Sequence, residues 1–363
     1  MASVQYLDNH DEYMNLAINL AKKGMGSVSP NPLVGCVIVK GSRVIGEGYH
    51  KEFGGEHAEV DALRNCSESP VGASLYVNLE PCNIYGKTPP CTKSIIENSI
   101  SSVYIGIKDP NPEVNGSGIE ELKHAGIKVS TDILYDKCLD LNKGFFKWIN
   151  TKMPYVIAKV AQTKDGFMGQ DDKTSIWITG KKTKEHTHNL RSMVDAILVG
   201  RNTADIDDPQ LTVRKVLGNN PIRVILDTNR KLPLTLKIFN DKNAKTYIMC
   251  SNDRFEDNKT SFCEFVSTKE KDFMLDPYDI LKQLGKKGIT SVLIEGGKRV
   301  HESFFNADLI DEIYTYTSNK IIEGATLKNP LVLDDNWILN DQIHLEEDTL
   351  KIVKKKELCL QES

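Results

Sequence analysis

Four residues in the first third of the chain could together hold and use a metal ion. His57 is followed two positions later by Glu59, and Cys82 and Cys91 come after them, each directly behind a proline. Imidazole and thiolate are good ligands for Zn²⁺, and three protein ligands leave its fourth tetrahedral position open for a water. Glu59 is too close to His57 to be an obvious fourth ligand, but it is well placed to move protons. Because zinc lowers the pKa of a bound water towards about 7, these residues predict a catalytic zinc site.

The order of these residues is typical of zinc-dependent deaminases. Their signature is His-x-Glu followed by Pro-Cys and a second Cys, with the glutamate acting as general acid and base rather than as a ligand. Eight residues separate Cys82 from Cys91, more than in that signature, so an inserted loop is expected between the two thiolates. Two alternatives stay open on the residues alone. His57 and the cysteines could be ordinary buried residues, or a closed structural zinc could take Cys36 or Cys66 as its fourth ligand.

Length, charge and cysteine content narrow the class of protein. A chain of 363 residues exceeds the usual size of a single core, so two domains are expected. The 46 basic residues are balanced by 50 acidic ones, which argues against a nucleic-acid substrate because no polybasic surface is indicated. Eight cysteines without a secretory signal favour reduced thiols and a cytoplasmic location. No membrane partner is expected, since no segment approaches the roughly 20 apolar residues of a spanning helix.

Elements expected in residues 1–150 would bring the zinc ligands to one edge of a sheet. A helix beginning near His57 places that residue and Glu59 on its first turn. A buried strand over 75–79 ends just before Cys82, at the strand end where ligands bind in α/β sheets. Cys91 opens another helix, whose dipole favours a thiolate. Further expected elements are helices over 12–23, 119–124 and 132–149, a hairpin over 34–46, and strands over 103–107 and 127–129. The pattern predicts a three-layer α/β/α domain.

Residues 151–363 read as a second α/β domain after a linker at 150–154. The expected strands are 155–161, 196–200, 222–226, 246–249 and 291–294, and the expected helices are 181–193, 279–286 and 298–306. The pair Gly296-Gly297 stands between the last of these strands and the last helix. Backbone N–H groups at such a turn can bind a phosphate, although a tight turn by itself also calls for glycine. Spacing alone does not decide whether arginines such as Arg191 and Arg214 bind a phosphate or only solvent.

Runs of residues along nearly the whole chain carry a resemblance to a known family. In the first half they are Pro30-Asn31-Pro32-x-Val34-Gly35, His57-Ala58-Glu59, Leu79-Glu80-Pro81-Cys82, Thr88-Pro89-Pro90-Cys91 and Asp109-Pro110-Asn111-Pro112. In the second half they are Lys159-x-Ala161, Trp177-Ile178-Thr179, Arg191-Ser192-x-x-Asp195-Ala196, Asp207-Asp208-Pro209-x-Leu211-Thr212-x-Arg214 and Glu295-Gly296-Gly297. Together they resemble the bifunctional riboflavin-biosynthesis deaminase/reductases, a family that has the same long gap between its thiolates.

The resemblance implies a cytidine-deaminase-like N-terminal domain with zinc and a dihydrofolate-reductase-like C-terminal domain with NADPH. The first would hydrolyse the 2-amino group of 2,5-diamino-6-(5-phosphoribosylamino)pyrimidin-4(3H)-one, and the second would reduce the opened ribosyl group to ribityl. The expected partner is therefore a small molecule, and a homo-oligomer is expected. His57, Cys82 and Cys91 would be the zinc ligands, and Glu59 would shuttle protons.

Contacts with substrate and cofactor are also implied by the resemblance. The implied substrate contacts are Asn31 and Asn111 in the first domain and Ser175, Arg191, Leu211, Arg214 and Glu295 in the second. The two arginines would suit a phosphate because they can form bidentate, charge-assisted hydrogen bonds. The implied cofactor contacts are Gln162, Trp177, Thr203, Asp207, Gly297, Lys298, Arg299, Val300, His301, Glu302 and Ser303.

Two short runs depart from the family pattern. Asn83-Ile84 stands where the family usually has Ser-His, so Ile84 cannot do what that imidazole does for the substrate. Gln162-Thr163-Lys164 replaces a run that usually ends in Ser-Leu, although Thr163 keeps a hydroxyl. The departures leave two alternatives open, a reductase with a silent deaminase domain and a regulatory protein that binds a nucleotide without turnover.

Overall fold

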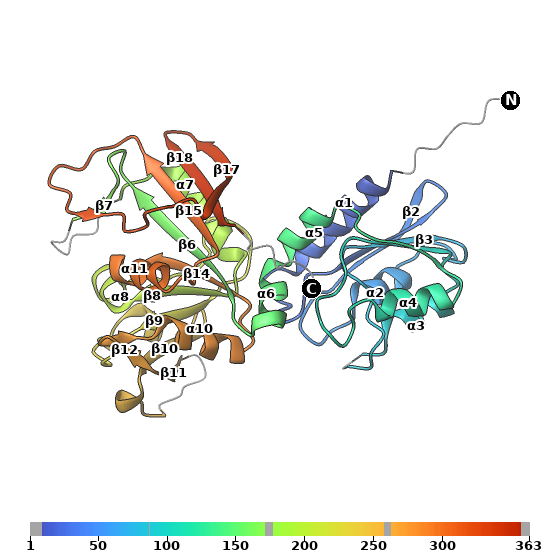
Figure 1. The fold of residues 1–363 in the computed structure, drawn as a ribbon, viewed down its shortest axis with the longest axis horizontal. Coiled ribbons are helices and arrows are strands. Elements are labelled where there is room, and N and C mark those ends of the chain that lie inside the picture. The colour runs from blue at the N-terminus through green and yellow to red at the C-terminus, as the bar shows by residue number, and fades with distance from the viewer. Residues whose placement is uncertain (1–8, 87, 171–176, 258–262, 357–363) are drawn as a thin grey trace. The chain divides into compact units, whose positions relative to one another are not determined.

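The computed structural model describes residues 9–86, 88–170, 177–257 and 263–356. The chain divides into an N-terminal unit up to Thr151 and a C-terminal unit from Lys152 onwards, which are described separately (Figure 1).

A five-stranded sheet forms the centre of the N-terminal unit. Its strands are β1 (Gly35–Lys40), β2 (Arg43–Tyr49), β3 (Ser74–Val77), β4 (Ser102–Ile105) and β5 (Lys128–Ser130), in the order β2-β1-β3-β4-β5. Strand β1 runs antiparallel to β2 and β3, whereas β3, β4 and β5 are parallel. Its helices are α1 (His10–Ala21), α2 (Ala58–Arg64), α3 (Cys91–Glu97), α4 (Ser117–His124), α5 (Tyr135–Leu141) and α6 (Lys143–Thr151), with a 3₁₀ turn at Lys22–Gly24.

Side chains that alternate along β1 build two cores, one on each face of the sheet. Val37 and Val39 pack with α1, α5 and α6, whereas Cys36 and Ile38 pack with α2, α3 and α4. Figure 1 shows α1 and α5 on one side of the sheet and α2, α3 and α4 on the other. This period-two pattern is what a strand buried on both faces requires. The predicted three-layer arrangement is present.

The expected single helix over 132–149 is wrong in its continuity. The structure contains α5 and α6 with a break at Asn142, and Leu134, at φ 54°, delays the start of α5 to Tyr135. The buried Asn142 side chain accepts a hydrogen bond from the Leu33 N–H at 2.8 Å and donates one to the Leu33 carbonyl at 2.9 Å. These bonds tie the break to the loop that follows Asn31, so the interruption supports that loop. Helix α6 also continues to Thr151 and so occupies the start of the expected linker.

A nine-stranded sheet forms the centre of the C-terminal unit. Its strands are β6 (Tyr155–Gln162), β8 (Ala196–Gly200), β9 (Ile222–Leu226), β10 (Thr246–Ser251), β11 (Cys263–Thr268), β14 (Ser291–Gly296), β15 (Glu312–Ser318), β17 (Trp337–Leu345) and β18 (Asp348–Lys355). The order is β11-β10-β9-β8-β14-β6-β15-β18-β17; β18 is antiparallel to β15 and to β17, and all other neighbouring pairs are parallel. Two small ribbons pair β7 (Phe167–Gly169) with β16 (Leu327–Lys328) and β12 (Glu270–Lys271) with β13 (Met274–Leu275).

Helices cover both faces of this sheet. They are α7 (Lys181–Ser192), α8 (Arg201–Asp207), α9 (Lys237–Asn240), α10 (Pro277–Lys286) and α11 (Lys298–Asn306), with a 3₁₀ turn at Asn252–Arg254. Buried side chains of α10 and α11 share one core, while those of α7, α8 and α9 pack on the opposite face. Strand β14 lies between β6 and β8, so its carboxyl end meets theirs at the sheet edge where α/β proteins bind ligands.

Close packing of α2 against β2 depends on Gly48. A Cβ atom at Gly48 would lie 2.3 Å from the Ala62 nitrogen and 2.5 Å from the Ala58 oxygen, both backbone atoms of α2. The Gly48→Ala variant should therefore lose about 1–3 kcal/mol of unfolding free energy, because α2 must move away from the sheet. Urea unfolding of the full-length protein measures this, with the exposed neighbour Glu47→Ala as the control. Equal midpoints for the two variants would contradict this account of how α2 is placed.

Candidate active sites

Three potential metal ligands converge in the N-terminal unit. The ligand atoms of His57, Cys82 and Cys91 all lie within 4.8 Å of one another. His57 Nδ1 is 3.2 Å from Cys91 Sγ and 3.4 Å from Cys82 Sγ. Tetrahedral zinc bonds nitrogen at about 2.0 Å and sulfur at about 2.3 Å, which places donor atoms at comparable separations. Both the donor types and the size of this triangle therefore fit Zn²⁺.

The ends of three elements hold these ligands in place. His57 is the residue directly before α2, Cys91 is the first residue of α3, and Cys82 follows β3. The Thr92 N–H donates to the Cys82 carbonyl at 3.2 Å, which joins the start of α3 to the segment that carries Cys82. Thr88, from the expected loop between the thiolates, has its Oγ1 3.3 Å from His57 Nε2. This contact orients the imidazole so that Nδ1 faces the two sulfurs, as partners of metal-bound histidines commonly do.

Glu59 lies in the first turn of α2 and is 3% exposed. Burial raises the pKa of its carboxyl to about 7, and a hydrogen bond with Cys91 places it beside the ligand set. A carboxyl with a pKa near neutral can both accept and return a proton. The hydrogen bond from Cys91 lowers the pKa of Cys82 to about 4, so the triangle already favours one thiolate for a cation to bind.

Asn31 is linked to the ligand set by His50, a residue that the sequence analysis did not identify. The His50 ring has Nδ1 2.8 Å from the Glu56 carbonyl and Nε2 3.1 Å from Asn31 Nδ2. Because a carbonyl can only accept, Nδ1 carries the proton and Nε2 accepts from the Asn31 amide. Burial lowers the pKa of His50, which keeps the ring neutral in this role. Its centroid is 5.6 Å from that of His57, so Asn31 is fixed next to the ligand set.

Asn111 is held in a loop that is organised by Glu80, another residue without a role in the sequence analysis. Buried Glu80 accepts backbone hydrogen bonds from Asp109, Gly116 and Ile119 at 3.2, 2.9 and 3.1 Å. Within this loop the Asn111 N–H donates to the Asp109 carboxyl at 2.8 Å. Burial raises the pKa of Asp109 to about 6. Glu80 therefore couples the segment before Cys82 to the loop with Asn111.

Asn83 and Ile84, which depart from the family pattern, lie in the segment that joins the two zinc-ligand cysteines. Asn83 accepts a hydrogen bond from Ser117 Oγ at 2.9 Å, which joins it to the start of α4. Ile84 is half-buried in the loop between the two thiolates. Its alkyl side chain offers neither a hydrogen bond nor a charge at that position.

A cluster of charges lies at the carboxyl end of β14 in the C-terminal unit. Arg191 on α7 forms a two-pronged pair with Glu295, with Nε to Oε1 at 2.6 Å and Nη2 to Oε2 at 2.8 Å. Arg191 Nη1 donates to the Thr212 carbonyl at 3.2 Å. The Arg214 N–H donates to His188 Nδ1 at 3.2 Å, and burial lowers the pKa of His188 to about 4. Arg191, Arg214 and Glu295 are thus brought together, and His188 joins them.

Lys159 belongs to the same cluster but had no assigned role. Burial lowers the pKa of this half-buried lysine, while the charge of Glu295 opposes that shift. Its Nζ lies 5.7 Å from the centroid of the Tyr316 ring. Leu211 is buried and has a positive φ of 53°, and Ser175 lies outside the described residues. A polar residue inside an otherwise apolar strand such as β6 is the signal that could have identified Lys159.

The glycine turn after β14 forms a cradle that a side chain would fill. A Cβ atom at Gly296 would lie 2.8 Å from Thr203 Cγ2 and 3.0 Å from its Oγ1, and Gly297 has a φ of 89°. The turn opens directly into α11, whose first N–H groups suit a phosphate. Thr203 and Gly297 are therefore neighbours, and exposed Asp207 ends the same helix α8. This arrangement fits the pyrophosphate of a dinucleotide such as NADPH.

Other residues implied as cofactor contacts have varied surroundings. Val300 is buried, and fully buried His301 has its nitrogens 3.2 Å from the carbonyls of Gly297 and Lys159. Gln162 is bonded to Thr317 and Asn329. Other side chains on α11 have local partners or face solvent: Lys298 lies 3.8 Å from Glu302, Ser303 Oγ donates to the Val300 carbonyl, and Arg299 is exposed. Trp177 is exposed near α7.

Comparisons with known proteins identify the family. Residues 154–350 match the model of the RibD C-terminal domain, and residues 7–107 match that of the cytidine and deoxycytidylate deaminase zinc-binding region. The chain is 39% identical to riboflavin biosynthesis protein RibD of Aquifex aeolicus, over 95% of this chain and 94% of that protein. The chain belongs to the RibD family. This member is also 40% identical to RibD of Bacillus amyloliquefaciens, over 92% of this chain and 91% of that protein.

Solved structures agree with this assignment. The diaminohydroxyphosphoribosylaminopyrimidine deaminase/5-amino-6-(5-phosphoribosylamino)uracil reductase of Thermotoga maritima is similar with a TM-score of 0.86 and 35% identity, over 96% of this chain and 99% of that one. RibD of Acinetobacter baumannii has a TM-score of 0.84 at 35% identity, with the same coverage.

Family membership confirms several predictions made from the sequence. The N-terminal domain is a zinc-binding, cytidine-deaminase-like domain, and the C-terminal domain is an NADPH-using reductase with a dihydrofolate-reductase-like fold. The chain is accordingly a bifunctional enzyme of riboflavin biosynthesis rather than a regulatory nucleotide-binding protein. In the described part of the chain, no helix has the length and apolar character needed to cross a bilayer.

Metal content tests the zinc ligands. Purified wild-type protein should hold one zinc ion per chain, and Cys91→Ser should lose most of it because a thiolate ligand is removed. Cys66→Ser is the matched control, since Cys66 lies just beyond the end of α2 and its Sγ donates to the Ala62 carbonyl of that helix at 3.4 Å. Elemental analysis after dialysis measures both. Loss of zinc from Cys66→Ser would instead support a closed structural site.

Cofactor affinity tests the glycine cradle. Gly296→Ala should weaken NADPH binding about tenfold, because the added methyl group displaces Thr203 and narrows the turn. Ser303→Ala is the control and should bind normally, since that side chain bonds within α11. Titration of NADPH fluorescence measures both dissociation constants. Unchanged affinity in Gly296→Ala would place the cofactor elsewhere.

Proposed function

We propose that this enzyme deaminates 2,5-diamino-6-(5-phosphoribosylamino)pyrimidin-4(3H)-one and then reduces the ribosyl group of the product to ribityl with NADPH. The observation that carries the proposal is the triangle of His57, Cys82 and Cys91 with buried Glu59 beside it. The name of the similar Thermotoga maritima enzyme supports the choice of substrate. The domains proposed for the two reactions are residues 1–150 and 151–363.

In the deaminase domain, we propose that His57, Cys82 and Cys91 hold the zinc ion and Glu59 moves the protons. Zinc supplies Lewis acidity and makes a water nucleophilic near neutral pH. Glu59 would accept a proton from the attacking water and would return protons to the ring and to the departing ammonia. Asn31, oriented by His50, and Asn111 orient the pyrimidine. Water is consumed and ammonia is released.

In the reductase domain, we propose that the glycine cradle and Thr203 orient NADPH. The cofactor supplies the hydride, and the protein supplies orientation and electrostatics. Reduction of the carbonyl group of the opened ribosyl chain would also require a proton at the carbonyl oxygen. Lys159 is our candidate for the donor of this proton, because burial lowers its pKa and it lies in the charge cluster with Glu295. Glu295, held by Arg191, contacts the substrate.

The proposal also covers the substrate class, the cellular location and the assembly of the enzyme. Balanced charge supports a small-molecule substrate without nucleic acid or membrane, and the cysteine content supports the cytoplasm. We also propose a homo-oligomer. A silent deaminase domain is the second candidate, and it rests on Ile84. Intact convergence of the three ligands with Glu59 favours an active domain.

Substitution of Glu59 tests the deaminase half. Glu59→Gln should keep its zinc but lose deamination by about 10²–10⁴-fold, because the general acid and base is removed while the ligands remain. Release of ammonia and zinc content are measured on the same preparation. As the control, the variant should oxidise NADPH normally with substrate that has already been deaminated. Full deamination by Glu59→Gln would end the assignment of Glu59, and wild-type protein that fails to oxidise NADPH with that substrate would end the reductase assignment.

A further inference from the structure

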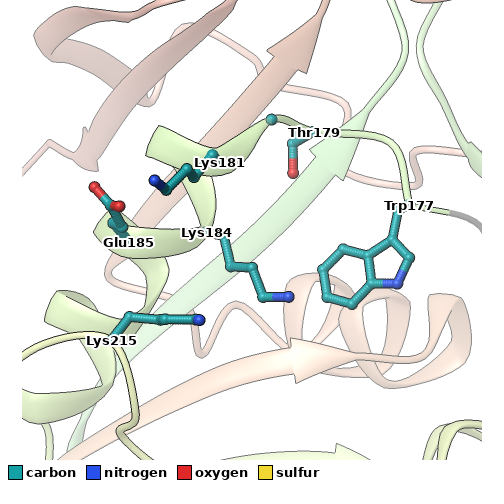
Figure 2. A pocket seen from close by; sticks show the side chains of 7 residues that line it. Trp177, Thr179, Lys181, Lys184, Glu185 and Lys215 are labelled. Atoms are coloured by element: carbon teal, nitrogen blue, oxygen red, sulfur yellow. The ribbon is translucent and has the colours of Figure 1, made fainter.

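A fully buried histidine of the reductase domain lies on the far side of the sheet from α7. Lys159 turns its side chain to the α7 face, because Ile157, two residues before it on β6, packs against α7. That face also carries a cavity of about 390 Å³, lined by Trp177, Thr179 and other residues (Figure 2). His301 comes from α11, which packs on the opposite face, and it is 0% exposed. Any effect of His301 on the active site must therefore act from behind the sheet.

Strand β6, which carries Lys159, loses its neighbour β14 at this point. The register of β14 shifts between Ile294 and Gly296, and its pairing with β6 ends at Ile294. The Tyr155 N–H donates to the Thr290 carbonyl on the β14 side. Because the backbone groups of a parallel strand alternate between its two neighbours, those of Lys159, four residues later, also point towards β14. The Lys159 carbonyl thus lies just beyond the last paired residues.

The His301 imidazole occupies this position beside β6. Its Nε2 lies 3.2 Å from the Lys159 carbonyl, and its Nδ1 lies 3.2 Å from the Gly297 carbonyl. Both neighbours can only accept, whereas a neutral imidazole has a single N–H to donate. Burial lowers the pKa of His301 to about 4, so the ring is neutral at physiological pH. The two carbonyls therefore compete for one proton.

The Gly297 carbonyl gains little from that proton. It already accepts the N–H of Val300 at 3.0 Å and the N–H of His301 at 3.1 Å, and a carbonyl oxygen has two lone pairs. The Lys159 carbonyl instead lies where the bonds between β6 and β14 have ended. A buried carbonyl without a donor costs more than an additional bond to a satisfied one contributes. The proton therefore stabilises the structure most when it is on Nε2.

We propose that His301 is a positioning residue of the reductase, whose Nε2–H holds the backbone of Lys159 beside the glycine cradle. The inference rests on the proposed function of the C-terminal domain. Gly297 belongs to the cradle and directly precedes α11, the helix that carries His301, so one ring joins the cofactor side of the site to Lys159. The cofactor and the candidate proton donor thereby keep a fixed separation. His301 acts on the cofactor through Gly297 rather than by direct contact.

Two amide variants distinguish the nitrogens of the ring. Glutamine places its –NH₂ group close to the position of Nε2, whereas the shorter asparagine places it close to that of Nδ1. In steady-state kinetics of the full-length protein with deaminated substrate, His301→Gln should keep kcat within about threefold of wild type. His301→Asn should lower kcat at least about tenfold and leave KM for NADPH within about twofold, because Gly297 keeps both backbone donors. His344→Gln, at an exposed histidine of β17, is the matched control.

A double variant tests whether His301 acts through Lys159. Lys159→Gln alone should lower kcat by about 10²-fold or more, because the candidate proton donor is removed. Adding His301→Asn to it should change kcat by less than about twofold, since the side chain that His301 positions is already absent. Multiplied losses in the double variant would show that the two residues act independently, and they would overturn the inference.

Three results from the single variants would also overturn the inference. Equal losses of kcat in His301→Asn and His301→Gln would show that the ring only fills space. A loss in His301→Gln alone would place the proton on Nδ1. A raised KM for NADPH in His301→Asn at unchanged kcat would assign the ring to the cofactor instead of to Lys159.

Nitrogen-15 NMR of the histidine rings in wild-type protein separates this inference from the proposed function. The His301 signal is identified by its absence from His301→Gln, and it should show a neutral ring protonated at Nε2 between about pH 6 and 8. Protonation at Nδ1, or at both nitrogens, would contradict the inference even if the variants do not fold. If the expected signal is seen but the enzyme does not oxidise NADPH with deaminated substrate, the hydrogen bond stands and the proposed function fails. If wild type and His301→Asn turn over equally, the positioning role fails alone.

Discussion

Carboxylates that are buried where they work must be compensated by nearby donors or charges, and both active sites depend on this constraint. Glu80 meets it with three backbone N–H groups, two from the loop before α4 and one from the first turn of that helix. Glu295 meets it with the fork of Arg191. Glu59 meets it only partly, so burial raises its pKa to about 7. The carboxyl with incomplete compensation is the one that can exchange a proton, whereas the other two organise their surroundings.

The same constraint explains why each site is formed at the ends of elements. The zinc ligands stand at the starts of α2 and α3 and after β3, where backbone groups are free to orient side chains. In the C-terminal domain the glycine turn after β14 lies against Thr203 of α8 and leads into α11. Glycine is required at Gly48 and at Gly296 for a related reason, since each lets a helix approach until a Cβ atom no longer fits. Close approach of helices to strands thus sets the geometry of both sites.

Much of the fold could be predicted from local patterns, because helix and strand periods and the glycine turn are local properties. The break at Asn142 could not, since its bonds join it to Leu33, far away in the sequence. Strands β15, β17 and β18 were not predicted. Much of β17 is exposed, so it lacks the continuous apolar run that marks the central parallel strands.

The candidate site residues also fall into two groups, those that local sequence predicts and those that depend on contacts distant in sequence. The zinc ligands and Glu59 have a local sequence signature, but His50, Glu80 and Lys159 gain their roles only through contacts with residues distant in sequence. Sequence also could not show that Arg191 is paired with Glu295, because 104 residues separate them. That pair places the Arg191 guanidinium on the Glu295 carboxylate.

X-ray absorption at the zinc edge of the wild-type enzyme tests the central claim most directly. An open site held by His57, Cys82 and Cys91 predicts two sulfur neighbours at about 2.3 Å and two lighter atoms, one from the imidazole and one from solvent, at about 2.0 Å. A spectrum with three or four sulfur neighbours would contradict the account, because it would require a further cysteine and close the position at which the reaction takes place.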